Sequence, residues 1–288
     1  MPEPFFLGLD FGTESVRAVC VDRTGSTIAS AVSPYARGQI TAGSAAAREL
    51  FPAPLPPSFA LQDPADWIES AAQACRLLPR DAAARVAGVG VDFTSCTMLP
   101  ALSDGTPLCA GRRDLSADPP TWPKLWKHHG ALTQTDRINR IAQQRREPWL
   151  ARYGGIVGLE WLFPKILEVI ESSPAAANAA EVWLEAGDWF VWQLVGSPCA
   201  GGRTDAVSMP RSTCQAGYKG LWSSNDGFPS AEYLTAVNPA MAVVRAKKLP
   251  GRFVAPGQQA GLLCESLASK MGLRPGIAVS AAIIDAHS

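Results

Sequence analysis

Two carboxylates near opposite ends of the chain are the residues best suited to chemistry. Asp10 ends an apolar run, residues 5–10, and the tight turn Gly12-Thr13 separates it from a second apolar run. Such a turn can bring backbone N–H groups and a hydroxyl up to a phosphate. Asp285 follows another apolar run, residues 277–284, so a strand would present it at its end. Together these features suggest a phosphate-binding turn and a general base, as in a kinase.

The residues around these two carboxylates predict a series of strands and helices. Turn residues divide the first part into short β-type runs, and Asp63-Pro64 is typical of a helix N-cap followed by a first helical position. We expect strands at residues 5–10, 16–22, 27–34, 86–93, 96–103 and 107–110, with an Asp104-Gly105 hairpin between the last two.

The middle of the chain predicts helices, and its end returns to a strand. Helical spacing of apolar residues indicates helices over 122–144, 159–171 and 181–195, with a break at Tyr153-Gly154-Gly155. From Gly201 onward we expect loops and β-type segments until a short helix at 265–271 and the strand at 277–284. Strands at both ends with helices between them predict an α/β fold. Trp183, Trp189 and Trp192 are expected in its core.

Composition excludes several classes of protein. The chain has 288 residues, 47% of them apolar, and its 26 basic residues balance 26 acidic ones, so no charge excess points to nucleic acid or an anionic membrane. Its seven cysteines form no C-x-x-C pair, and its start lacks a signal peptide. We therefore expect a soluble protein of a reducing cytoplasm. His128 and His129 are adjacent, which makes a poor metal site, so we interpret them as surface or packing residues.

The turn that contains Gly12-Thr13 points to a particular family only when the residues after it are included. A D-x-G-T turn alone is equally well an ordinary hairpin with a glycine at positive φ. The longer string DFGTESVR, followed by the strand VCVD, resembles the first phosphate motif of the actin/hexokinase/Hsp70 superfold, which is ribonuclease H-like. Within that superfold it resembles the FGGY carbohydrate kinases. No Walker A loop and no G-x-G-x-x-G occurs in the sequence.

Further blocks narrow this resemblance to the ribulokinase group and extend it over nearly the whole chain. They are GVGVDFTSCTMLPALSDGTPLC (88–109), WPKLWKHHGA (122–131), EWLFPKILEV (160–169), EAGDWFVWQL (185–194), RSTCQAGYKGLW (211–222) and IDAH (284–287). The resemblance implies an ATP-dependent kinase that phosphorylates L-ribulose, or a related ketopentose, at its 5-hydroxyl. D-ribulose or a pentitol would need only modest changes in the pocket.

Catalytic roles follow from the resemblance, residue by residue. Asp285 matches the base that takes the proton from the sugar hydroxyl, although a helix N-cap is its alternative interpretation. Asp10 matches the carboxylate near Mg²⁺ and the ATP phosphates, and could instead be a turn-forming residue. The residues that match the turn approaching the phosphates are Gly12, Thr13, Ser15 and Arg17. On a strand, Arg17 could equally be a solvent-facing arginine.

The resemblance also implies a sugar pocket formed by Ser95, Trp126, Lys219 and Asp285. Lys219 would supply hydrogen-bond donors, Trp126 an apolar face and an indole N–H, and Ser95 a close backbone approach. The alternatives are a surface lysine, a core tryptophan on an amphipathic helix, and a serine at a strand end. The expected partner is a small ketopentose, without nucleic acid or membrane, and whether the chain forms a homodimer stays open.

Kinases of this family have two lobes around a cleft. We expect residues 1–283 to form the N-terminal, sugar-binding lobe, with a mixed sheet and flanking helices. Residues 284–288 would begin the hinge to a C-terminal, ATP-binding lobe that is absent from this chain. The chain alone is then expected to turn over little. The alternative is a non-catalytic sugar-binding or regulatory lobe.

Overall fold

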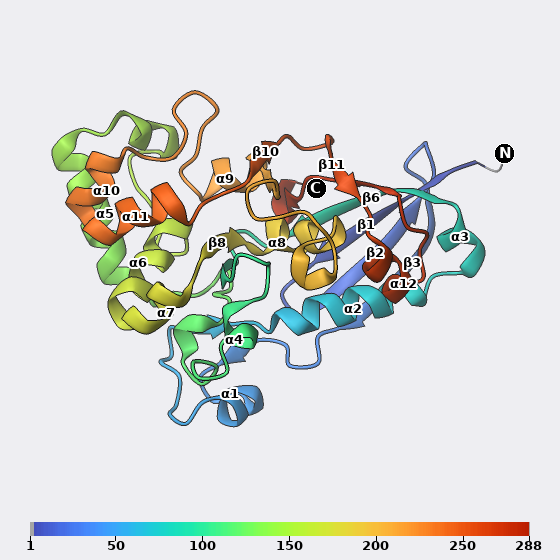
Figure 1. Ribbon diagram of the computed structural model, residues 1–288, viewed down its shortest axis with the longest axis horizontal. Helices are drawn as coiled ribbons and strands as arrows, with labels where there is room; N and C mark the ends of the chain where they lie inside the picture. The colour runs from blue at the N-terminus through green and yellow to red at the C-terminus, as the bar shows by residue number, and fades with distance from the viewer. Residues whose placement is uncertain (1–2, 288) are drawn as a thin grey trace.

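A mixed sheet of seven strands forms one end of the molecule (Figure 1). The computed structural model describes residues 3–287. The strand order is β11-β12-β6-β1-β2-β3, and β13 also pairs with β6. Strands β1, β12 and β13 run parallel to β6, whereas β2, β3 and β11 are antiparallel to their neighbours. The bounds are β1 Phe5–Phe11, β2 Ser15–Val21, β3 Thr27–Pro34, β6 Val86–Phe93, β11 Gln259–Leu262, β12 Ala278–Ser280 and β13 Ile283–Ile284.

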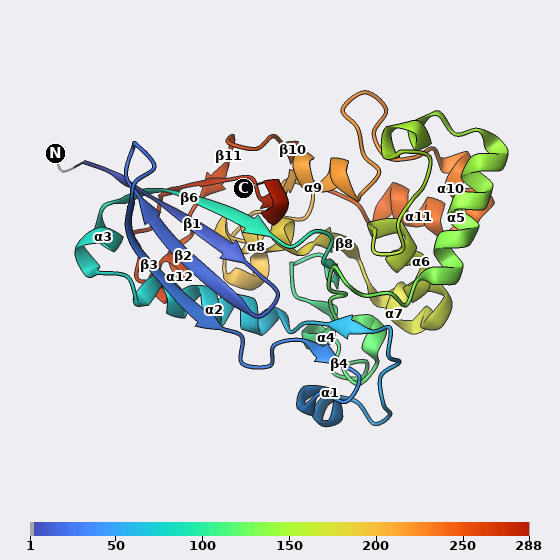
Figure 2. The same cartoon turned by 180° about the vertical axis from the view of Figure 1, so that it is seen from behind.

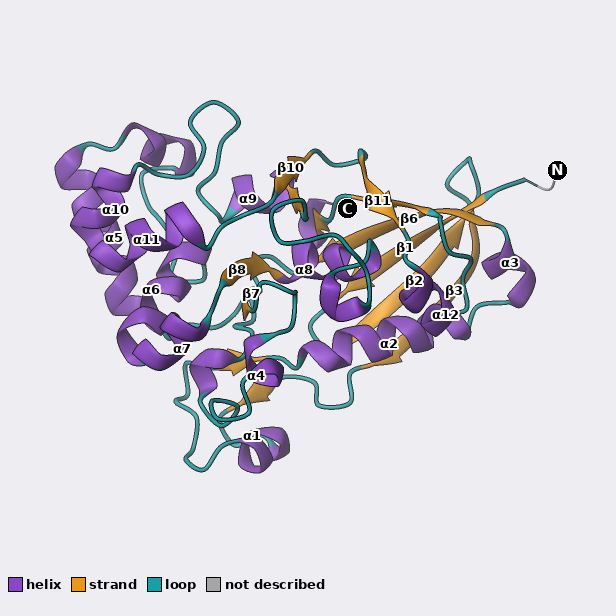
Figure 3. Ribbon diagram, in the orientation of Figure 1, coloured by secondary structure: helices purple, strands orange, loops and turns teal. Residues whose placement is uncertain are grey.

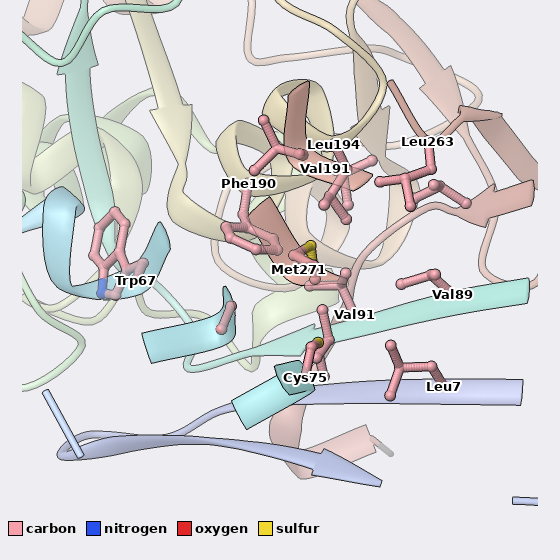
Figure 4. Packing of buried hydrophobic residues seen from close by; sticks show 14 of the residues in the cluster. Leu7, Trp67, Cys75, Val89, Val91, Phe190, Val191, Leu194, Leu263 and Met271 are labelled. Atoms are coloured by element: carbon pink, nitrogen blue, oxygen red, sulfur yellow. The ribbon is translucent and has the colours of Figure 1, made fainter. Parts of the chain in front are cut away.

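Three helices cover one face of this sheet. They are α2 (Pro64–Arg76), α8 (Ala186–Leu194) and α12 (Glu265–Met271). Side chains such as Leu7, Trp67, Val91 and Phe190 fill the space between the helices and the strands (Figure 4). The opposite face, seen in Figure 2, leaves Phe6 40% and Val32 51% exposed. One face of the sheet therefore belongs to a core, and the other is open.

A second group of helices lies at the far end of the molecule from the sheet (Figure 3). Its members are α5 (Leu132–Arg145), α6 (Leu162–Ser172), α7 (Pro174–Ala179), α10 (Ala231–Val237) and α11 (Pro239–Lys247). They enclose a separate apolar cluster that includes Phe163, Ile166, Trp183 and Tyr233. The antiparallel pair β7 (Met98–Ala101) and β8 (Val182–Glu185) lies between this group and the sheet.

Short elements complete the fold. The remaining strands are β4 Ile40–Thr41, β5 Ala60–Leu61, β9 Pro210–Ser212 and β10 Arg252–Val254. The remaining α-helices are α1 Ala45–Leu50, α3 Arg80–Ala84, α4 Leu108–Gly111 and α9 Thr213–Tyr218. The 3-10 helices are η1 Pro119–Thr121, η2 Pro148–Tyr153, η3 Pro198–Ala200 and η4 Asp285–His287. Within residues 3–287, no helix is both long and apolar enough to cross a membrane.

Several predicted elements are confirmed. The α/β class, the first three strands, the strand at 86–93 and the helix at 265–271 agree with the structure to within one or two residues. The side chain of Asp63 accepts a hydrogen bond from Ala65 N–H (2.9 Å), and Pro64 begins helix α2, as the cap signal predicted. The break at Tyr153 ends η2, with Gly154 at φ 68°. Trp183, Trp189 and Trp192 are buried in the core.

Other predicted elements are wrong. The helix expected over 122–144 begins only at Leu132, because Lys124 instead pairs its backbone with Met98 in both directions and Leu125 donates to Ala60. Residues 181–195 form β8 and then α8 rather than one helix. Residues 107–110, expected as a strand, lie mainly in α4. The region after Gly201, expected as loops and β-type segments, contains the helices α9, α10 and α11. The strand expected at 277–284 is split into β12 and β13.

Candidate functional site

The candidate site lies where three parallel strands end at the same edge of the sheet. Phe93 of β6 is in register with Phe11 of β1 on one side and with Ile284 of β13 on the other. The residues that directly follow these strands therefore meet at that edge. Open α/β sheets bind ligands beyond the carboxyl ends of their strands. The turn after β1, the segment beginning at Thr94 and the carboxylate of Asp285 all reach this place.

The turn between β1 and β2 is held from outside by side chains of two other segments. The hydroxyl of Tyr35 donates to the carbonyl of Gly12 (3.0 Å), and Gln62 Nε2 donates to the carbonyl of Thr13 (2.9 Å). Gly12 N–H donates to the carbonyl of Ser15 (3.1 Å). A Cβ atom at Gly12 would meet only that carbonyl, at 3.5 Å, which is an ordinary contact. The fold around Gly12 therefore does not itself require a glycine there.

Asp10 and Arg17 lie opposite each other on β1 and β2. Their Cα atoms are partners in the ladder, and Arg17 Nη1 is 3.7 Å from Asp10 Oδ2. The Arg17 side chain is 58% exposed and that of Asp10 38%. An exposed ion pair at this distance contributes little to stability. Both groups are thus available to a ligand at the sheet edge, although Arg17 also fits the interpretation of a solvent-facing arginine.

Asp285 opens η4 directly after β13, and the charges of Asp10 and Lys219 act on its carboxyl group. Its own carboxylate accepts a hydrogen bond from the N–H of the next residue, Ala286 (2.8 Å), and Asp285 is the first residue of η4 rather than a cap that precedes it. Partial burial raises the pKa of Asp285 and the negative charge of Asp10 raises it further, while the Ala286 N–H, Lys219 and His287 act in the opposite direction. A carboxylate with a raised pKa is a better proton acceptor than an ordinary aspartate.

Lys219 follows directly after helix α9 and is not a surface lysine. Its Nζ donates to the carbonyl of Ser95 (3.0 Å) and to Glu160 Oε2 (2.9 Å), and its side chain is only 13% exposed. Ser95 itself is buried, and its Oγ has no hydrogen-bond partner. A buried hydroxyl without a partner is costly, so Ser95 Oγ is a polar atom that the fold itself leaves unsatisfied.

Helix α9 is fixed in place by buried polar groups of α8. Asp188 Oδ1 accepts from the backbone N–H of Ser212 (2.7 Å), and Asp188 N–H donates to Gln215 Oε1 (3.2 Å). Burial raises the pKa of Asp188 to about 7, although Arg211 and the Ser212 N–H oppose this shift. Helix α9 also touches η4: Cys214 Sγ lies 3.4 Å from His287 Nδ1, and the ring centroids of Tyr218, the last residue of α9, and His287 are 5.2 Å apart. These contacts bring the end of α9 close to Asp285.

Trp126 contacts Thr13 in the turn after β1, whereas one interpretation of the sequence placed it in the core on an amphipathic helix. It lies on an irregular segment rather than a helix, is 36% exposed, and its indole N–H donates to the hydroxyl of Thr13 (3.1 Å). The core interpretation of this tryptophan is therefore wrong. Its N–H contacts the turn after β1, and about a third of the residue stays accessible.

The segment around Trp126 rests on a buried group of three polar side chains. His128 Nδ1 accepts from Ala60 N–H (3.3 Å), which assigns the proton to Nε2, and Nε2–H then donates to Glu168 Oε2 (2.8 Å). Lys124 Nζ donates to Glu168 Oε1 (3.2 Å). Burial and the neighbouring ammonium of Lys124 lower the pKa of His128 to about 3. Burial also lowers the pKa of Lys124, although Glu168 opposes that shift.

Sequence reasoning missed Glu160, whose carboxylate contacts Lys219. It also gave no role to Lys124 or Glu168. His128 is buried and His129 is half exposed, which agrees with packing and surface positions. The only signal for Glu160 was a charged residue between the apolar Leu159 and Trp161, and that pattern is common at exposed loops. Its proximity to Lys219, 59 positions away, appears only in the folded chain.

A metal ion bound at this edge of the sheet would have few ligands from the protein. Among residues 3–287, no group of three or more His, Cys, Asp and Glu side chains is arranged to hold a metal ion. Asp10 is an accessible carboxylate, and its negative charge raises the pKa of Asp285. Mg²⁺ is commonly bound by one or two carboxylates together with water and phosphate oxygens. Asp10 fits such a site.

Comparisons of the sequence find ribulokinases. The chain is 40% identical to the ribulokinase of Shouchella clausii over 98% of its own length and 48% of that protein. It is 39% identical to the ribulokinase of Geobacillus thermodenitrificans over its whole length and 49% of that protein. The chain therefore spans about half the length of the curated relatives it matches, and the matching half is the N-terminal one. No family model matches the chain.

Comparisons of the structure find sugar kinases with the same fold. The xylulose kinase of Rhodospirillum rubrum aligns with a TM-score of 0.68 at 19% identity, covering 97% of this chain and 49% of that one. The glycerol kinase of Plasmodium falciparum with ADP aligns with a TM-score of 0.66 at 14% identity, covering 99% and 49%. These likenesses confirm the predicted actin/hexokinase-like lobe with its mixed sheet.

Proposed function

Since this chain is homologous along its whole length to the N-terminal half of ribulokinases, we propose that it is the sugar-binding lobe of an ATP-dependent carbohydrate kinase. The proposed reaction transfers the γ-phosphoryl group of ATP to the 5-hydroxyl of L-ribulose or a related ketopentose. In this proposal residues 1–283 form the lobe, and residues 284–288 begin the hinge to an ATP-binding lobe.

One observation carries the proposal. A carboxylate, Asp285, lies at the same sheet edge as Asp10, and the charges of Asp10 and Lys219 both act on it. Phosphoryl transfer to an alcohol needs a base for the hydroxyl proton and positive charge or donors around the phosphate. Asp285 would take the proton from the attacking hydroxyl, and its raised pKa supports that role. Lys219, fixed by Ser95 and Glu160, would donate to sugar oxygens.

The remaining pocket residues offer complementary surfaces for a ketopentose. Ser95 Oγ is a buried hydroxyl without a partner, and Trp126 is a 36% exposed residue with a flat apolar ring. A sugar presents both hydroxyls and C–H faces, so it is bound by polar groups together with an aromatic wall. The curated relatives at 37–40% identity are named ribulokinases, which supports L-ribulose over the substrates of the more distant sugar kinases.

ATP would approach from the turn between β1 and β2. The local fold does not require glycine at position 12, so the absence of a side chain there suits the close approach of a phosphate. Thr13 offers a hydroxyl and an N–H, Ser15 begins β2 beside it, and Arg17 supplies a guanidinium. Asp10 would hold Mg²⁺, which neutralises phosphate charge when it is bound.

The proposal is tested by Asp285→Asn in the complete, two-lobed kinase. Asparagine keeps the size of the side chain but cannot accept the hydroxyl proton, so kcat should fall by about 10³-fold or more. L-ribulose binding, measured by calorimetry, should stay within about threefold of the unaltered protein. Asp226→Asn is the matched control, because Asp226 is exposed and pairs with Arg152 away from the site.

Two outcomes would contradict parts of this proposal. Activity of the Asp285→Asn variant within about tenfold of the unaltered kinase would exclude Asp285 as the general base. Binding of L-ribulose without any turnover in the unaltered two-lobed protein would favour the alternative of a non-catalytic sugar-binding or regulatory lobe.

A further inference from the structure

The ammonium group of Lys219 is held by two acceptors from different parts of the chain. One is the carbonyl of Ser95, at the end of the sheet, and the other is the carboxylate of Glu160, in the loop before helix α6. A lysine ammonium has three N–H donors. Two of them have these partners, so the direction of the third is set by the positions of Ser95 and Glu160.

The loop that carries Glu160 is fixed without the help of its carboxylate. Buried Asn139 clamps the backbone of Val157, donating to its carbonyl (2.9 Å) and accepting from its N–H (2.7 Å). Leu162 N–H donates to the carbonyl of Lys219 (3.2 Å), and the hydroxyl of Tyr153 donates to the carbonyl of Gly217 (2.9 Å). The loop and the end of α9 are therefore already joined by hydrogen bonds that do not involve the Glu160 carboxylate.

The carboxylate of Glu160 thus adds little that the fold needs. Its side chain is 32% exposed, and ion pairs this accessible contribute little to stability. Its second oxygen, Oε1, lies 3.8 Å from Nε2 of His129, a half-exposed ring on the segment that also carries Trp126. Glu160 therefore lies between two segments that the proposed function places in the sugar pocket.

We propose that Glu160 is a positioning residue of the sugar site, acting through Lys219. Its carboxylate aligns the ammonium so that the third N–H is directed at a sugar oxygen. This inference rests on the proposed function, because it assumes that Lys219 contacts the sugar. Without Glu160 the flexible lysine side chain loses one of the two contacts that orient it, so sugar binding weakens while the fold is retained.

The test measures L-ribulose binding to the 288-residue chain by calorimetry in a double-mutant cycle. Glu160→Gln and Glu160→Ala should each raise the Kd, the alanine variant by about tenfold. Lys219→Met should raise it at least as much. In a chain that already carries Lys219→Met, Glu160→Ala should raise the Kd by less than about a further twofold. The reason is that Glu160 affects sugar binding only by orienting the Lys219 ammonium. Thermal unfolding of every variant checks that the fold is intact.

The matched control is Glu171→Gln on helix α6, which removes a carboxylate that pairs with the Arg137 side chain away from the sheet edge. It should leave the Kd unchanged. An unchanged Kd in Glu160→Ala, or equal effects of that substitution with and without Lys219, would overturn the positioning role. If the unaltered chain binds neither L-ribulose nor other ketopentoses, the proposed sugar site itself is wrong, and the inference falls with it.

Discussion

His128 illustrates how a single buried side chain links the site to pH. Its ring is neutral in the folded chain because burial and the ammonium of Lys124 lower its pKa to about 3. In the unfolded chain an ordinary histidine has a pKa of about 6.5. Between these two values the unfolded state binds a proton that the folded state does not. The contribution of His128 to stability is therefore complete above pH 6.5 and is lost as the pH falls toward 3.

We expect His128→Gln to reduce the acid sensitivity of the protein. Glutamine can still accept from Ala60 N–H and donate to Glu168, but it does not titrate. Between pH 7 and pH 5 the unaltered protein should lose about 2 kcal/mol of unfolding free energy through His128, and the variant should lack that loss. Urea unfolding at both pH values measures the difference. His129→Gln makes the same change on a half-exposed ring and is the control; equal pH dependence of the His128 variant and the unaltered protein would contradict the assignment.

At the scale of elements, helix α6 connects the two segments that carry Ser95 and Trp126. Lys165 is fully buried on α6, and its Nζ donates to the carbonyls of Cys96 (2.6 Å) and Leu125 (2.8 Å). Burial lowers the pKa of Lys165 to about 8. Hydrogen bonds from a buried charge are among the stronger ones in proteins. One side chain of a helix therefore joins two segments of the candidate site.

We expect Lys165→Met to weaken both stability and sugar binding. Methionine has a similar length but leaves two buried carbonyls without this donor, which should cost about 2–4 kcal/mol of unfolding free energy. The Kd for L-ribulose should rise because the segments of Ser95 and Trp126 are no longer tied together. Denaturant unfolding and calorimetry measure the two effects, with Lys247→Met at an exposed position of α11 as control. Unchanged stability and binding would show that Lys165 has no such role.

Local signals predicted some elements well and others not at all, for identifiable reasons. β1, β2 and the start of α2 depend on alternation and on the Asp63-Pro64 cap, both of which are local. The segment 122–131 has helical spacing, but it pairs with Met98 and Ala60, which are distant in sequence. In the candidate site, Asp10, Lys219 and Asp285 were predicted from motifs. Glu160 was not, because only the fold brings it to Lys219.

At the scale of the whole molecule, the candidate site is open on one side. Asp285 is exposed, and the Arg17 side chain is 58% exposed. Phosphoryl transfer depends on holding both reactants in line and excluding water from the reaction. The curated relatives are about twice as long as this chain, and a second lobe would face this edge in the proposed kinase.

We therefore expect the 288-residue chain alone to show little turnover. A coupled assay of ADP release, with Mg-ATP and a panel of ketopentoses and pentitols, measures this directly. Calorimetry on the same sample separates a lobe that binds sugar without turnover from one that binds nothing. Rapid turnover of L-ribulose would confirm the substrate and contradict the requirement for a second lobe.

The hydrogen bond from the Trp126 indole to the hydroxyl of Thr13 has an evolutionary consequence. A substitution at Trp126 that adapts the pocket to another sugar also removes a contact of the turn proposed to meet the phosphates. A substitution of Trp126 that favours a new sugar would therefore also disturb the turn proposed to bind the phosphates of ATP. Ser95 Oγ has no such contact, so we expect diversification of sugar preference among descendants of this sequence to begin at position 95 and to spare position 126.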